Sequence, residues 1–254
     1  MSKDHVGTPR FIMEGFSVNN HAWCYNTINN KKYNCNISDL GVENNYYDEY
    51  VEKNILANDV ESEGAKFRQE FLGIIDKKDN YWGNKLVAFT HNNKTIVTRM
   101  FSYMLFRAKK ALEPINKESI PKVLLGEISH SDFLGFQAVM ELNIPKEMHN
   151  NYNVSPLVIL LDEQDFINNS IGFAILHTGQ IFIPFDTKAG VVITPDETEE
   201  NKIYQLTYPL NIEDLNRSIV RYEKDNGNGF FFSKKESDLD KAIEYFHKCE
   251  KKNV

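Results

Sequence analysis

Short apolar runs separated by paired asparagines set the pattern of much of this chain. Among these pairs are Asn19-Asn20, Asn29-Asn30, Asn92-Asn93 and Asn168-Asn169. Asn accepts a positive φ more readily than any residue except Gly, so Asn-Asn suits the two-residue turn of a β-hairpin. Residues 10–38 therefore predict a three-stranded meander with strands at 11–18, 21–28 and 31–38. This register places Cys24 directly opposite Cys35.

Apolar residues at helical spacing predict about four helices. The first spans 62–76, with Ser62 as its cap, and another begins near residue 101 and stops at Pro114. Two more helices close the chain, one through residues 212–222 and one from residue 237 onward. Between the first two helices, the runs 86–89 and 95–99 flank Asn92-Asn93 and predict a second hairpin.

The second half of the chain predicts mostly strands. The wholly apolar run 157–161 is typical of a central strand that is buried on both faces. Residues 171–176 and 181–185 predict a tight hairpin about Thr178-Gly179, and further strands follow at 191–194, 203–208 and 230–232. Strands and helices occur in blocks, which favours an α+β fold with mostly antiparallel sheet built from hairpins. We expect one domain over 1–254, or two closely packed halves, 1–113 and 122–254, divided by the proline-flanked segment 114–121.

The composition excludes several classes of protein but does not indicate a particular activity. The chain has 254 residues, 41% of them hydrophobic and 26% charged, which is typical of a globular protein. Its net charge of -7 disfavours a general nucleic-acid binder. No apolar run approaches the roughly 18–20 residues that span a bilayer, and three cysteines do not suggest a disulfide framework. We expect a cytoplasmic protein without a membrane partner, and no nucleotide-binding or zinc fingerprint indicates a cofactor.

One candidate catalytic set is Asp186-Thr187-Lys188, at the end of a predicted strand. The triplet is similar to the Asp-x-Lys element of metal-dependent nucleases of the restriction-endonuclease type. In those enzymes two acids hold Mg²⁺ and a lysine helps to orient the attacking water. Asp165 (or Asp162) would supply the upstream acid, and Glu70 a further one. The competing interpretation is that Lys188 is a solvated turn residue.

A second candidate set is a thiol hydrolase with Cys24 as nucleophile and His177 as base. The order of the two residues is compatible with papain-like enzymes, in which the cysteine lies early and the histidine late. Such a cysteine normally begins a helix, whereas Cys24 falls in a predicted strand. Cys24, Cys35 and His21 also form an incomplete zinc set, since a closed site needs four ligands. The simplest interpretation is that Cys24 and Cys35 are small apolar sheet residues.

An acidic segment that keeps three tyrosines is the candidate binding region. Tyr46, Tyr47 and Tyr50 lie within it, and aromatic side chains often anchor protein contacts. No catalytic set in the chain has specific spacing. We therefore expect an intracellular protein that binds another protein through this acidic aromatic loop or through an exposed sheet edge, with the nuclease and the hydrolase as alternatives.

Overall fold

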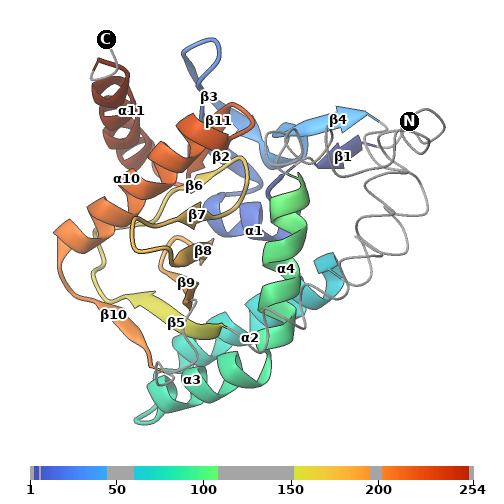
Figure 1. Cartoon of the computed structure of the whole chain (residues 1–254), viewed down its shortest axis with the longest axis vertical. Helices are drawn as coiled ribbons and strands as arrows, with labels where there is room; N and C mark the ends of the chain where they lie inside the picture. Colours follow the sequence, from blue (N-terminus) through green and yellow to red (C-terminus); the bar gives the residue numbers. More distant parts are fainter. Residues whose placement is uncertain (1–2, 6, 45–59, 108–151, 195–201, 252–254) are drawn as a thin grey trace.

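Two larger sheets, a pair of short strands and the helices around them make up the described part of the protein (Figure 1). The structure is a computed structural model that describes residues 3–5, 7–44, 60–107, 152–194 and 202–251. Most strand pairs in the two sheets are antiparallel. The α+β class predicted from the sequence is therefore confirmed. The predicted linker 114–121 lies outside the described residues.

The larger sheet has five strands in the order β10-β5-β9-β8-β7. They are β5 (Asn153–Ile159), β7 (Ala174–Ile175), β8 (Ile181–Asp186), β9 (Ala189–Thr194) and β10 (Tyr204–Leu206). β5 pairs with β10 in parallel and with β9 in antiparallel fashion. It is an interior strand whose residues are nearly all buried, as its apolar run predicts. The hairpin at Thr178-Gly179 is also present, and Gly179 supplies its positive φ of 81°.

The smaller sheet has four antiparallel strands in the order β3-β2-β11-β6. They are β2 (His21–Asn26), β3 (Lys31–Asn36), β6 (Asn168–Asn169) and β11 (Phe230–Ser233). All four residues of β11 are buried, so its phenylalanines are core residues and not an exposed anchor. Two short strands, β1 (Lys3–His5) and β4 (Val42–Asn44), form a separate antiparallel pair.

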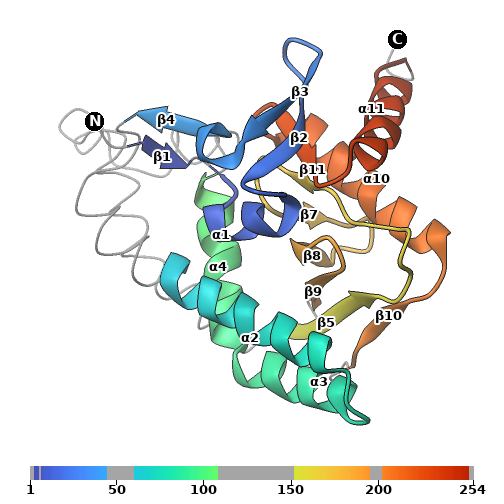
Figure 2. The same ribbon diagram turned by 180° about the vertical axis from the view of Figure 1, so that it is seen from behind.

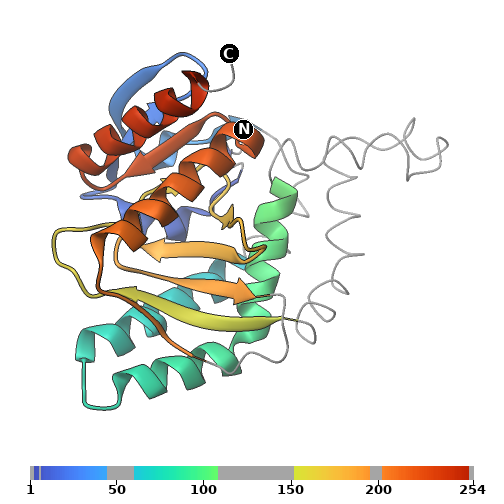
Figure 3. The ribbon, with the colours of Figure 1, turned by 60° about the vertical axis from the view of Figure 1, so that its left-hand side comes forward.

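The helices lie on both faces of the larger sheet (Figures 2 and 3). They are α1 (Arg10–Met13), α2 (Glu63–Lys77), α3 (Trp82–Asn92), α4 (Lys94–Arg107), α10 (Pro209–Asn226) and α11 (Glu236–Lys251), with short 3-10 turns at Glu14–Phe16 and Ile37–Asp39. α3 and α4 pack against β5, and α2 packs against both of these helices. α10 crosses the opposite face, where it contacts β10 and β7, and α11 packs against α10 and β2. Within the described ranges, no helix combines the length and the apolar character that a membrane span requires.

Several local predictions are wrong, and Ser62, predicted as the cap of α2, makes no capping hydrogen bond with its side chain. Residues 11–18 are not a strand, because Pro9 begins a short helix in which its carbonyl accepts hydrogen bonds from Ile12 N and Met13 N. The predicted hairpin around Asn92-Asn93 is a pair of helices, α3 and α4, because its apolar residues follow a helical period. Asn168-Asn169 is a buried strand and not a turn.

The hairpin of β2 and β3 is confirmed, but its register differs from the predicted one. Cys24 lies opposite Tyr33 and not opposite Cys35. The connection has four residues because Asn26 Oδ1 accepts hydrogen bonds from Ile28 N (2.9 Å) and Asn29 N (3.1 Å). This shift by two residues keeps every side chain on its predicted face.

Candidate functional site

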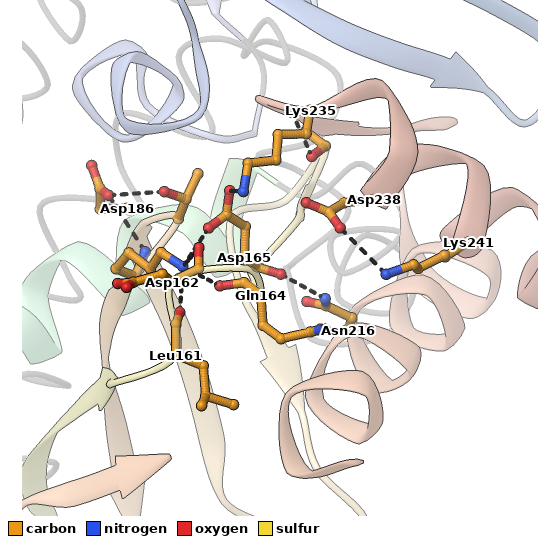
Figure 4. A network of polar contacts seen from close by, with 12 residues as sticks. Leu161, Asp162, Gln164, Asp165, Asp186, Asn216, Lys235, Asp238 and Lys241 are labelled. Carbon is orange, nitrogen blue, oxygen red and sulfur yellow. Dashed lines mark hydrogen bonds and ion pairs between the residues drawn. The ribbon is translucent and has the colours of Figure 1, made fainter. Parts of the chain in front are cut away.

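Charged side chains meet where three segments converge, and we call Asp165, Lys188 and Lys235 the Asp165 centre (Figure 4). Asp165 is only 3% exposed. Its Oδ1 lies 2.8 Å from Lys188 Nζ, and its Oδ2 lies 2.9 Å from Lys235 Nζ. A buried carboxylate is tolerated when opposite charges compensate it, and here two lysines do so.

The surrounding backbone holds the Asp165 centre in place. Asn216 on α10 donates from Nδ2 to the carbonyl of Asp165 (2.9 Å) and accepts from the N–H of Ile167 (3.1 Å). Lys188 Nζ donates to three carbonyls of the preceding loop: Leu161 (2.6 Å), Asp162 (2.8 Å) and Gln164. Lys188 therefore closes this loop with its side chain and is not a solvated turn residue.

The nuclease candidates are brought together only in part. Lys188 contacts Asp165, as such a site requires, but Asp186 pairs with Arg68 on α2, with Nη2 and Oδ2 3.0 Å apart. Arg68 Nε also donates to the carbonyl of Phe185 (2.8 Å). Figure 4 shows the Asp186 side chain apart from that of Asp165. In the part of the chain that the structure describes, no three His, Cys, Asp or Glu side chains are grouped to hold a metal ion.

The hydrolase candidates lie in different sheets. Cys24 is fully buried in β2, whereas His177 is exposed in the turn between β7 and β8. A hydrogen bond with the Cys35 thiol and burial both raise the pKa of Cys24, and the same hydrogen bond lowers the pKa of the half-buried Cys35. The surroundings of Cys24 therefore disfavour its thiolate, which is the form that acts as a nucleophile.

Among the described residues, β3 forms one end of the four-stranded sheet, and no described strand pairs with its outer edge. The N–H of Ile37 donates to the carbonyl of Asn20 (2.8 Å), which fixes the phase of the β2–β3 ladder. Because alternate residues of an edge strand face its neighbour, the backbone N–H and C=O groups of Lys32, Asn34 and Asn36 point away from β2. The other predicted binding region, with Tyr46, Tyr47 and Tyr50, lies outside the described residues.

A buried polar cluster around Glu223 is a feature that the sequence analysis missed. Glu223 Oε2 accepts hydrogen bonds from Ser170 Oγ (2.6 Å) and Ser170 N (3.0 Å), and its Oε1 accepts from Gly229 N (2.7 Å) and Phe230 N (2.9 Å). One sequence signal could have revealed it, because Glu223 follows Ile219 by one helical turn on the apolar face of α10. The cluster ties α10 to the ends of β6 and β11.

A comparison of the chain with known family models, curated proteins and solved structures finds no match.

Proposed function

We propose that this chain is an intracellular protein-binding protein, and that β3 receives an extended, acidic segment of a partner protein as an additional strand. The open edge of β3 carries the proposal. Strand addition takes its affinity from backbone hydrogen bonds and its specificity from alternate side chains. The outward N–H and C=O groups of Lys32, Asn34 and Asn36 are available for these backbone hydrogen bonds.

The side chains of β3 indicate the character of the partner segment. The strand has two lysines and no acidic residue. Lys32 is neutralised by Glu236 (2.8 Å) and Asp240 (2.7 Å) of α11, whereas Lys31 forms no ion pair with any described residue. Tyr33, two residues after Lys31 and on the same face of the strand, is 37% exposed. An acidic residue next to an apolar one would complement this pair.

A second copy of the chain fits this edge less well. Lysines on an edge strand are a common device against self-association. Two copies of β3 side by side would bring Lys31 of both chains to one interface without an acid to pair with it. The charge pattern therefore favours a different, acidic partner over self-pairing.

Selection of short random peptides on the full-length chain tests the proposal. We expect the enriched peptides to be acidic and extended, with an affinity that fluorescence anisotropy can measure. Asn34→Pro removes an outward N–H and obstructs strand addition, so it should weaken binding about tenfold or more. Asn34→Thr keeps the N–H and is the matched control, which should bind normally.

A charge variant provides an independent measurement should the proline disturb the hairpin. Lys31→Glu should also weaken the selected peptides about tenfold, whereas Lys77→Glu, at the far end of α2, should not. Peptides that bind equally well to Asn34→Pro and Lys31→Glu would refute the proposal. Enrichment of neutral or basic peptides, or concentration-dependent dimerisation through β3, would refute it as well.

A further inference from the structure

A cavity of about 730 Å³ lies between α10 and α11. Its volume is in the range of small-molecule sites. Asn216, Arg217, Val220 and Arg221 of α10 line one wall, and Asp238, Ala242 and Tyr245 of α11 line the other. Apolar and charged groups thus share the walls, which is typical of sites that orient a small polar ligand.

Asp238 stands at one end of this cavity without an adequate partner. The residue is 7% exposed, and its Oδ2 accepts no hydrogen bond from the described residues. Its nearest cation is Lys241, with Nζ 3.8 Å from Oδ1. The two other nearby lysines, Lys188 and Lys235, are already paired with Asp165. Buried carboxylate oxygens are normally hydrogen-bonded, so this oxygen indicates a donor that the chain itself does not provide.

The other end of the cavity presents a cation. Arg221 Nη2 donates to the hydroxyl of Tyr245 (2.9 Å), and its guanidinium forms no ion pair with a carboxylate of the described residues. Tyr245 follows Asp238 by seven positions on α11, which corresponds to about 10 Å along the helix. The cavity wall therefore carries an incompletely paired carboxylate, with Lys241 beside it, and, about 10 Å further along α11, an arginine without a carboxylate partner among the described residues.

We propose that this cavity binds a small molecule with a protonated amine or guanidinium at one end and a carboxylate at the other, the class that basic amino acids represent. The cationic end donates to Asp238, and the carboxylate lies against Arg221. Glu213 and Glu244 also line the cavity, where they pair with Arg217 (3.4 Å) and Lys248 (2.7 Å). This site is separate from the β3 edge and does not depend on it.

Titration of the full-length chain with L-lysine and L-arginine, followed by NMR, tests this assignment. We expect at least one of them to shift the resonances of α10 and α11 in a saturable manner. Cadaverine lacks the carboxylate and hexanoate lacks the amine, so each should bind about tenfold more weakly or worse. Cadaverine binding as tightly as L-lysine would contradict a two-ended site.

Two aspartates of α11 supply matched variants. Asp238→Asn removes the charge at the cavity and should weaken binding about tenfold to a hundredfold. Asp240→Asn removes an exposed charge that faces Lys32 and should leave binding unchanged. Asp238→Asn relieves a buried charge, so we expect this variant to fold. Unchanged affinity in Asp238→Asn, or no saturation by L-lysine and L-arginine at millimolar concentrations, would overturn the proposal.

Discussion

Ser170 and Glu223, 53 positions apart in the sequence, are joined by two hydrogen bonds to one carboxylate oxygen, from Oγ at 2.6 Å and from the backbone N–H at 3.0 Å. The second oxygen accepts the N–H groups of Gly229 and Phe230. Glu223 thus satisfies donors from two segments, and Ser170 Oγ in turn accepts the N–H of Asn228 (2.7 Å). Glu223 therefore helps to connect α10 to the sheet that carries β3.

Glu223→Ala should destabilise the chain most among the variants of this cluster. It leaves the buried N–H groups of Gly229 and Phe230 without an acceptor, so we expect a loss of about 3 kcal/mol or more in the free energy of unfolding. Glu223→Gln keeps one acceptor oxygen and should cost less. Urea unfolding followed by tryptophan fluorescence measures both. The matched control is Glu213→Gln, a partly exposed residue near the start of α10, and it should change stability by under about 0.5 kcal/mol.

The same carboxyl group predicts a pH dependence of stability. Burial raises the pKa of Glu223 from 4.5 to about 7, although the four donated hydrogen bonds oppose this rise. The folded chain therefore binds this proton more tightly than the unfolded chain. Its contribution, on the order of 3 kcal/mol, is complete below about pH 4.5 and is lost as the pH rises through 7. The unfolding free energy of the wild type, minus that of Glu223→Gln, should therefore decrease as the pH rises from about 4.5 to 7. An increase over this range would show that folding lowers the pKa of Glu223 and does not raise it.

The Asn19-Asn20 turn predicts opposite effects for two substitutions. Its residues have φ values of 51° and 62°, and Val18 and His21 exchange backbone hydrogen bonds of 2.8 and 2.9 Å around it. Asn20→Gly removes the penalty of a positive φ and should be neutral or stabilising by a few tenths of a kcal/mol. Asn20→Val should cost about 1–2 kcal/mol, since a β-branched residue resists this conformation. Thermal unfolding compares them, with Asn34→Val in an extended strand as a control of little effect.

The two neighbouring thiols should differ in their reaction with iodoacetamide. Cys35 is half-buried with a lowered pKa, whereas Cys24 is fully buried with a raised pKa. Mass spectrometry should detect alkylation of Cys35 in the folded chain and of Cys24 only after urea is added. Rapid labelling of Cys24 in the native state would mean that the site is open, and it would support the hydrolase alternative.

Local patterns predicted the elements whose cause is local. The Asn19-Asn20 turn and the helix α2 follow from residue type and apolar period within a few positions. The strand β5 was recognised because a continuous apolar run needs burial on both faces. The α+β class follows from these elements, since strands and helices occur in blocks and not in strict alternation.

Elements whose cause is distant were not predicted. Asn168-Asn169 has the composition of a turn, but its side-chain amides donate to one carbonyl four residues away and to two carbonyls that are distant in the sequence. Asn168 Nδ2 donates to Pro184 O (3.3 Å), and Asn169 Nδ2 donates to Phe173 O (2.9 Å) and Ile219 O (3.4 Å). The pair is buried only because the folded chain provides these acceptors.

In the candidate sites too, contacts between nearby segments could be predicted from the sequence, whereas contacts with distant segments could not. The contact between Asp165 and Lys188 was contained in the nuclease hypothesis, because both residues flank predicted strands. The pairing of Asp186 with Arg68 was not, since α2 lies more than a hundred residues earlier in the chain. Asp238 gave no signal, because an aspartate in the first turn of a helix is ordinary on electrostatic grounds alone.

Amide hydrogen exchange along β3 tests most directly whether its edge is open to a partner. In the free full-length chain, we expect the outward N–H groups of Lys32, Asn34 and Asn36 to exchange fast, and those of Tyr33 and Cys35 to exchange slowly. A selected acidic peptide should then protect the three outward groups. Slow exchange at all five positions in the free chain would show that another segment already covers this edge, and the central proposal would be wrong.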